Sequence, residues 1–226
     1  MLSKPSSQML GAAAAILAGL SVFGPAGEAG AEQNRQQVAA AGYGLDPALI
    51  RKAHSLPRLP IADEQRGGYD RDSWGGWEEG VEGTCLNMRH AVLAMSSRIR
   101  TRTGKNGCSV TGGQWVDVYT GKTMADPQAI DVDHVVAVQE ADDSGAKRWT
   151  ARQKAAFYND PMNLVPVDRE VNKKKAAKGP EEWLPASSER RCAFLVRWVE
   201  VKLKYGLTAD RRESEAIEDG IDAYCR

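Results

Sequence analysis

One stretch decides the fold: Asp131-Val132-Asp133-His134, followed by Asn163-Leu164 and then by Asn172-Lys173-Lys174-Lys175. Residues 132–138 form a short run rich in β-branched side chains, which favours a strand. Residues 164–167 predict a second short strand, and Asp168 can cap a helix that carries Asn172 and Lys175. The pattern therefore predicts a strand–strand–helix unit over residues 130–178.

The side chains of this unit are suited to the hydrolysis of a phosphodiester. That reaction needs a base that deprotonates the attacking water, and positive charge where negative charge develops. His134 suits the first task because imidazole titrates near neutral pH. Asp133 and the side-chain carbonyl of Asn172 suit the second task, because both are hard oxygen ligands for Mg²⁺ or a similar cation that keeps most of its waters.

Strand geometry places a condition on this interpretation. Neighbours in a regular strand point to opposite faces, so Asp133 and His134 can act on one phosphate only at a strand end or in a distorted stretch. Asn172 and Lys175 share a helix face, so Lys175 can reach the phosphate if Asn172 binds metal. Asp131 fits either a residue that tunes the site or a solvated strand-end acid, and residues 173–175 also fit a solvated helix face.

The unit resembles the ββα-metal core of HNH (His-Me finger) endonucleases, in which an Asp-His pair ends the first strand, an Asn starts the second, and a final His or Asn on the helix completes the metal site. The resemblance covers residues 57–225 and is closest to the secreted bacterial HNH family of the DUF1524 type. Outside the core it rests on these stretches: residues 69–77 (Tyr-Asp-Arg-Asp-Ser-Trp-Gly-Gly-Trp), 84–93 with Arg89, Tyr119-Thr120-Gly121, Ser144-Gly145-Ala146, Asn159-Asp160 and Trp183-Leu184-Pro185.

The resemblance implies a role for each matching residue. His134 would be the general base, Asp133 and Asn172 the metal ligands, and Asn163 the residue that fixes the loop orienting His134. Lys175 matches the basic position three residues after the last Asn, which implies a phosphate contact. Asn in place of His at the third motif position favours Mg²⁺ or Mn²⁺ over a softer metal. The insertion between His134 and Asn163 is longer than in minimal HNH motifs, and we expect it to shape substrate access.

The 226 residues indicate one compact α+β domain with small appendages. Residues 1–31 combine Lys4, an apolar and small stretch over residues 9–23, and an A-x-A site at residues 29–31, which is typical of a secretory signal peptide and too short for a membrane span. Residues 32–66 are polar and Ala-rich, so we expect a tether with little core of its own. Residues 67–226 would then form a soluble, exported, monomeric nuclease domain without stable membrane association.

The four cysteines fit an exported chain. Their number is even and no C-x-x-C spacing is present, so two disulfides are expected rather than a zinc site. Three pairings are possible from sequence alone. Local pairing, Cys85 with Cys108 and Cys192 with Cys225, is our prediction because each pair brackets a short helical or hairpin unit.

Charge is balanced overall, with 30 basic and 30 acidic residues, but it is unevenly distributed. Residues 126–143 carry six acids and no Lys or Arg, whereas residues 147–178 carry nine Lys or Arg and three acids. An acidic centre beside a basic strip would suit a metal site next to a phosphate-binding surface. Two oppositely charged solvated faces explain the same distribution equally well.

Flanking segments predict further elements. Met88, Val92, Met95 and Ile99 would line one face of a helix over residues 85–100, and residues 115–119 favour a strand. A capping box of Thr150 and Gln153 predicts a helix that stops at residues 159–161. Two helices close the chain, the first ending at Gly206 and the second capped by Asp210 with Glu213; their apolar faces are Phe194, Trp198, Val201, Tyr205 and Ile217, Ile221, Tyr224.

Three classes of function fit these observations. The first is a secreted, metal-dependent endonuclease that cuts DNA, or RNA, with low sequence specificity. The second is a catalytically weak HNH-fold protein that binds DNA or a partner without cutting, and the third is an exported domain with an unrelated surface role. The intact set of Asp133, His134, Asn163 and Asn172 favours the first class over the second. Other hydrolases lack support, because H-E-x-x-H and G-x-S-x-G are absent from the sequence.

Overall fold

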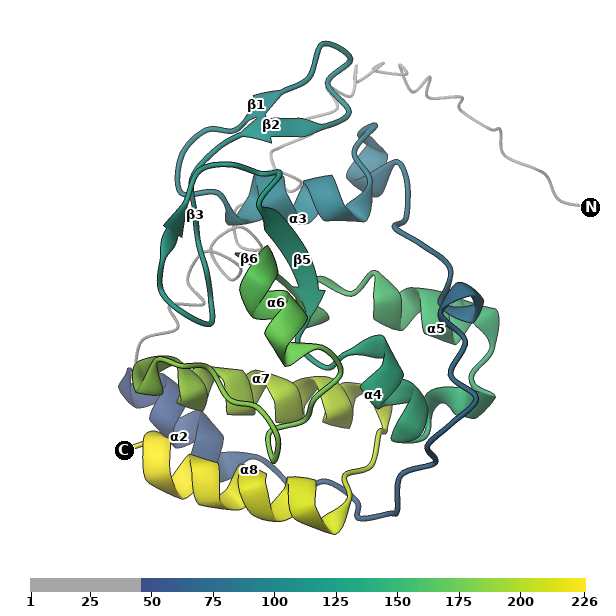
Figure 1. Cartoon of the computed structure of the whole chain (residues 1–226), viewed down its shortest axis with the longest axis vertical. Helices are drawn as coiled ribbons and strands as arrows, with labels where there is room; N and C mark the ends of the chain where they lie inside the picture. The colour runs from purple at the N-terminus through teal and green to yellow at the C-terminus, as the bar shows by residue number, and fades with distance from the viewer. Residues whose placement is uncertain (1–45) are drawn as a thin grey trace, which may run out of the picture.

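A computed structural model describes residues 46–226, and the predicted signal peptide and the first part of the predicted tether lie outside these residues. Short antiparallel sheets and helices make up a mixed α and β architecture, with the longest helices gathered at one end of the molecule (Figure 1). The helices are α2 (Pro47–Ser55), α3 (Met88–Ser96), α4 (Val138–Asp143), α5 (Ala151–Tyr158), α6 (Arg169–Lys175), α7 (Ser188–Tyr205) and α8 (Arg211–Tyr224), with short 3₁₀ turns η1 (Arg71–Trp74), η2 (Val81–Gly83), η3 (Ala146–Arg148) and η4 (Pro161–Asn163). The strands are β1 (Arg102–Thr103), β2 (Val110–Gly112), β3 (Trp115–Val116), β4 (Thr123–Met124), β5 (Ile130–His134) and β6 (Leu164–Asp168).

The predicted strand–strand–helix unit is present as β5, β6 and α6. The two strands pair antiparallel, with a register that runs from Ile130 opposite Asp168 to His134 opposite Leu164. Asp168 caps α6, because its carboxylate accepts the backbone N–H groups of Glu170 and Val171. The first strand covers residues 130–134 rather than 132–138.

The first strand ends early because a side chain takes over the backbone bonding that would extend it. The side chain of Asn163 accepts from the backbone N–H of Val136 and donates to its carbonyl, which ends the ladder at His134. Val138 then begins α4.

Helix α2 corrects the expectation for residues 32–66. Asp46 caps this helix and Pro47 occupies its first turn, and the helix packs against α7. Ala53 and Leu59 are buried, so the second half of the predicted tether contributes side chains to the core although most of its residues are exposed. Its polar, Ala-rich composition concealed an apolar stripe at Leu49, Ala53 and Leu56, whose spacing is that of one helix face.

Two further predictions were too long. Helix α3 ends at Ser96, so Ile99 does not extend its apolar face and is 53% exposed. The predicted strand over residues 115–119 is limited to Trp115 and Val116, because the Asp117 carboxylate accepts the backbone N–H of Tyr119 and turns the chain.

Both predicted disulfides are present, and the cap predictions hold. Cys85 bonds to Cys108 and Cys192 to Cys225, with Cα–Cα distances of 4.8 and 5.1 Å. Thr150 and Gln153 form the full capping box of α5, and α7 ends at Gly206 in the left-handed conformation (φ 64°). Asp210 caps α8 through the backbone N–H of Glu213.

The C-terminal helices are joined by a buried charge network as well as by apolar packing. Lys202 of α7 is fully buried and contacts Glu140 of α4 at 2.7 Å and Glu213 of α8 at 2.6 Å. Trp198 donates its indole N–H to the same Glu213 carboxylate. Buried charges persist only where they are paired and hydrogen-bonded, so this network fixes how the three helices meet.

Candidate active site

Asp133 and His134 lie at the end of β5 and point to opposite sides of it. Asp133 contacts Lys175 of α6, whereas His134 packs against Trp77 and the end of α5. Both side chains are buried. His134 is the last residue of the strand and the chain leaves the ladder directly after it, so the pair has the strand-end position that strand geometry asks for, while the two side chains still point to opposite sides.

His134 is held as a neutral imidazole with a defined tautomer. Its Nε2 lies 2.8 Å from the backbone carbonyl oxygen of Tyr158. A carbonyl oxygen only accepts, so Nε2 carries the proton and the lone pair is on Nδ1. The indole of Trp77 stacks on the ring at 5.6 Å with an interplanar angle of 4°. Burial lowers the pKa of His134 to about 3, with further lowering from the positive charges of Arg71 and Lys175.

Asn163 clamps the loop that follows His134. Its side chain is fully buried, accepts from the backbone N–H of Val136 at 2.9 Å and donates to the Val136 carbonyl at 3.0 Å. The backbone carbonyl of Asn163 accepts the backbone N–H of Val135 at 2.8 Å. Three hydrogen bonds from one residue therefore fix the two residues after the histidine, which is the geometry that a loop-fixing Asn requires.

Lys175 does not occupy the position predicted for it. Its ammonium group is fully buried, 3.0 Å from Asp133 Oδ2 and 2.9 Å from the backbone carbonyl of His134. The hydroxyl of Tyr119 donates to the same Asp133 oxygen at 2.7 Å. The phosphate contact predicted for Lys175 is therefore wrong for this arrangement, because its charge is used to compensate a buried carboxylate. Burial raises the pKa of Asp133, while Lys175 and Tyr119 oppose that shift.

Asn172 is oriented by Asp131, and this contact resolves the alternatives for Asp131. The amide Nδ2 of Asn172 donates to Asp131 Oδ2 at 3.2 Å, which turns its carbonyl oxygen away from Asp131. Arg169 in turn holds Asp131 at 3.1 Å. Asp131 is thus a partner of the candidate ligand Asn172 rather than a free, solvated acid.

As ligand types, the carboxylate of Asp133 and the amide oxygen of Asn172 suit a cation that takes few protein ligands. Across residues 46–226 no group of three or more His, Cys, Asp and Glu side chains is placed to hold a metal ion. Mg²⁺ and Mn²⁺ accept carboxylate and carbonyl oxygens, and Mg²⁺ commonly keeps several waters, so one carboxylate and one amide oxygen suffice. The donor set therefore fits a water-rich site and does not fit zinc, which takes four ligands, mostly Cys and His.

The basic strip over residues 147–178 is partly neutralised. Five of its nine Lys and Arg side chains form ion pairs with acids, and four of those acids belong to the acidic segment 126–143. The alternation of charge along the sequence is thus mostly internal pairing. The other four, Arg148, Arg152, Lys174 and Lys178, are exposed and form no ion pair with an acid of the described residues, so both interpretations of this charge pattern stay open.

Several groups that contact or support His134 were not predicted as site residues from the sequence. The carbonyl of Tyr158 holds His134, and Tyr158 closes the insertion between His134 and Asn163, so this insertion positions the candidate base. Arg71 donates to the Tyr158 hydroxyl at 2.7 Å and lies over its ring. Arg71 and Trp77 both occur in the stretch 69–77 that carried part of the resemblance, whereas a backbone carbonyl leaves no residue-type signal. The other two histidines, His54 and His90, bond to the backbone of Cys225 and Val110.

Comparison with known proteins gives this geometry a family. The model for the C-terminal domain of GmrSD restriction endonucleases, an HNH-type nuclease family, matches residues 93–219, more than half of the chain. A fungal protein from Arthroderma benhamiae, named an uncharacterized secreted protein, is 37% identical over 153 residues, covering 66% of this chain and 72% of its own length. No solved structure matches.

These findings confirm the HNH resemblance at the level of the family and correct its source. The relative is fungal, so the expectation of a bacterial group is not supported. The two disulfides and the secreted relative fit an extracellular protein, and no helix within residues 46–226 has the length and apolar character needed to cross a membrane. The chain therefore belongs to the family of GmrSD restriction endonuclease C-terminal domains.

Proposed function

We propose that this protein is an exported, metal-dependent endonuclease that hydrolyses the phosphodiester bonds of DNA with little sequence preference, and RNA is the alternative polymer. The observation that carries the proposal is the bond from His134 Nε2 to the Tyr158 carbonyl. It leaves Nδ1 as the nitrogen with a lone pair, and no hydrogen bond to Nδ1 is present among the described residues. A positioned, neutral imidazole is the form that accepts a proton from an attacking water.

The other residues would prepare this step. Asn163 fixes the loop after His134, and Trp77 stacks on the imidazole, so the base does not need to be ordered when the substrate binds. Asp133 and Asn172 would hold Mg²⁺ or Mn²⁺, which would supply positive charge at the scissile phosphate and the departing oxygen. Lys175 and Tyr119 would keep Asp133 ionised and oriented in the interior. The low sequence preference rests on the lack of a recognisable base-reading module in the sequence.

Incubation of the purified protein with supercoiled plasmid, single-stranded DNA and RNA tests the proposal. Each substrate is tested with Mg²⁺, with Mn²⁺ and with excess EDTA. We expect nicking and then degradation with either metal and none with EDTA. Undiminished cleavage in EDTA would rule out the metal, and a protein that binds plasmid but leaves it intact with both metals would instead be a non-cutting HNH-fold binder.

Substitution separates the base from the ligands. We expect Asp133→Ala and Asn172→Ala to abolish cutting and to weaken Mn²⁺ binding, which calorimetry measures directly. Asp131→Asn should weaken Mn²⁺ binding less, because the amide of Asn172 loses its charged partner but keeps its own oxygen. Unchanged Mn²⁺ affinity in both alanine variants would refute the ligand assignment without bearing on His134.

A further inference from the structure

A second basic region lies outside the candidate active site. The segment over residues 98–112, here called the basic hairpin, contains strands β1 and β2 and projects from the end of the molecule opposite α2 and α8 (Figure 1). It carries four exposed cations, Arg98, Arg100, Arg102 and Lys105. No Asp or Glu occurs between Glu82 and Asp117, so no acidic residue near the hairpin in sequence offsets its positive charge.

These four cations differ from the five paired cations of the strip over residues 147–178. Across residues 46–226 no ion pair joins any of them to an acid. Unpaired, solvent-exposed cations gathered on one projecting element repel one another and gain nothing for the fold. Binding of a polyanion would relieve this repulsion.

The hairpin is ordered before any partner arrives. The Cys85–Cys108 disulfide ties the loop between β1 and β2 to the segment that precedes α3. Its turn is closed by backbone bonds from Gly104 to Ser109 at 2.8 Å and from Gly107 to Gly104 at 2.9 Å. A ligand therefore need not pay for the ordering of this backbone, because binding to a preformed surface avoids that entropy loss.

The hairpin and the candidate active site share one support. Val110 of β2 packs in the same apolar cluster as Val92 and Leu93 of α3 and as Ile130 and Leu164 of β5 and β6. Strand β5 starts at this shared support and runs away from the hairpin toward His134 (Figure 1). The hairpin and the strand that ends at His134 are therefore held on one packed body.

We propose that the basic hairpin binds the phosphate backbone of a nucleic acid outside the bond that is cut. The identity of the polyanion rests on the proposed function, since a nuclease substrate continues on both sides of the scissile phosphate. Arg and Lys are donors without acceptor groups and match phosphate oxygens. The contacts are to the backbone, so they raise affinity uniformly across sequences and make it depend on salt.

Binding of a fluorescein-labelled DNA duplex to the full chain carrying His134→Ala, which prevents cutting, tests the hairpin. The variant Arg98→Gln, Arg100→Gln, Arg102→Gln, Lys105→Gln should bind roughly 10- to 100-fold more weakly at about 0.1 M salt, and the slope of log K against log salt should fall by up to about 3.6, because each phosphate contact contributes about 0.9. The matched control is Arg51→Gln, Arg211→Gln, Arg212→Gln, Arg226→Gln, which removes the same charge from exposed positions on or after α2 and α8 and should bind within about twofold. Equal loss in both variants, or none in the hairpin variant, overturns the proposal.

Three further measurements keep this inference separate from the proposed function. With His134 intact, both charge variants should hydrolyse bis(p-nitrophenyl) phosphate at the parent rate, because this small diester has no neighbouring phosphates. A parent that cuts nothing but binds duplex through the hairpin would sink the proposed function and leave the hairpin assignment standing. The variant Arg98→Lys, Arg100→Lys, Arg102→Lys keeps the charge and should keep most of the duplex affinity. If the glutamine variant of the hairpin instead lost binding to anionic vesicles but kept its duplex binding, the hairpin would bind lipid and the proposal would be overturned.

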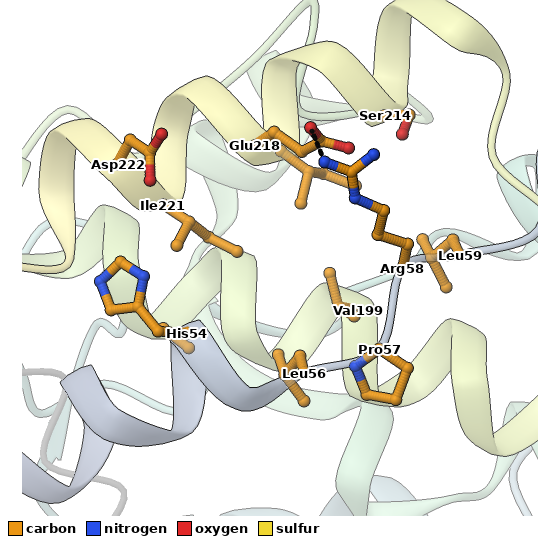
Figure 2. A pocket seen from close by; sticks show the side chains of 12 residues that line it. His54, Leu56, Pro57, Arg58, Leu59, Val199, Ser214, Glu218, Ile221 and Asp222 are labelled. Atoms are coloured by element: carbon orange, nitrogen blue, oxygen red, sulfur yellow. Dashed lines mark hydrogen bonds and ion pairs between the residues drawn. The ribbon is translucent and has the colours of Figure 1, made fainter.

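A cavity between α2, α7 and α8 is lined by Leu56, Val199 and Ile221, with the Arg58–Glu218 ion pair beside it (Figure 2).

Discussion

The ββα unit and the basic hairpin use charge in opposite ways. In the ββα unit, Lys175 is fully buried and paired with Asp133, and Arg169 and Asn172 both contact Asp131. In the hairpin, Lys105 and its three arginine neighbours are exposed, and no ion pair joins them to an acid of the described chain. The comparison teaches that the residue type does not decide the role: a buried, paired lysine maintains the architecture, whereas an exposed lysine and three exposed arginines without an acidic partner can meet a polyanion.

The largest expected effect is on the reaction itself. His134→Ala should lower the rate of plasmid cleavage by roughly 10²- to 10⁴-fold, because the general base is lost while Asp133 and Asn172 remain. Circular dichroism and Mn²⁺ calorimetry should show a nearly unchanged fold and metal affinity. Cleavage at the parent rate would show that His134 is not the general base, and the ββα unit would then no longer be the candidate active site in this comparison.

Removal of the buried cation should be almost as severe, but for stability. Lys175→Met leaves the Asp133 carboxylate buried without its counter-charge, which costs about 3–5 kcal/mol when one partner of a buried pair is removed. Lys173→Met on the same helix is the control, because Lys173 pairs with Glu170 at the surface and should change stability by less than about 0.5 kcal/mol. Urea unfolding of both variants measures the difference. Equal stabilities would mean that the Asp133–Lys175 pair does not hold the site.

These two lysines also mark how far the sequence alone leads. The ββα unit was predictable because its residues combine short β-branched runs with polar residues at strand and helix ends, as Asp168 and Asn163 show. The burial of Lys175 was not predictable, because it depends on the position of Asp133 across the unit. The role of the Tyr158 carbonyl was equally hidden, since every residue has a carbonyl.

Helix α2 and the basic hairpin were missed for a different reason. The spacing of Leu49, Ala53 and Leu56 is that of one helix face, but the polar, Ala-rich composition of the surrounding segment indicates a tether instead. In the sequence, Ile99 continues the spacing of Met95 and so predicts a longer helix face, but the chain leaves the helix at Ser97. Which cations lack an acidic partner is a property of the folded chain, so sequence could count the charges of the hairpin but not show that they were free.

Loss of the Cys85–Cys108 bond should connect the two regions. Cys85→Ser with Cys108→Ser opens a loop with a sequence separation of 23 residues, and the chain-entropy model gives a loss of about 3–4 kcal/mol. Because the bond fixes the hairpin, duplex affinity should fall a few-fold while hydrolysis of a small diester persists below the melting temperature. Cys192→Ser with Cys225→Ser is the matched control, because it should cost similar stability without changing duplex affinity. An equal drop in affinity in both variants would show that general destabilisation, not the hairpin, is responsible.

The buried network of α7 and α8 extends the comparison to a charge far from the site. Burial raises the pKa of Glu213 from 4.5 to about 7, despite the opposing effect of Lys202. Between these values the folded protein binds a proton that the unfolded chain does not, so the stability from this group falls as pH rises from 4.5 to 7, by at most about 3 kcal/mol. Glu213→Gln should flatten that part of the curve of melting temperature against pH, and the exposed Glu215→Gln should not. The idea fails if both variants follow the parent curve.

The smallest effect is expected from one exposed lysine, and it tests the comparison most directly. Lys105→Gln removes a cation with no partner in the described chain, so the free energy of unfolding should change by no more than about 0.5 kcal/mol. The same substitution should lower the slope of log K against log salt for duplex binding by about 0.9, the contribution of one phosphate contact. Lys175→Gln should give the reverse pattern, a large loss of stability with an unchanged salt slope, because its ammonium group does not reach the solvent. A Lys105 variant that is strongly destabilised, or a Lys175 variant that changes the salt slope, would erase the distinction between a charge that holds the fold and a charge that meets the substrate.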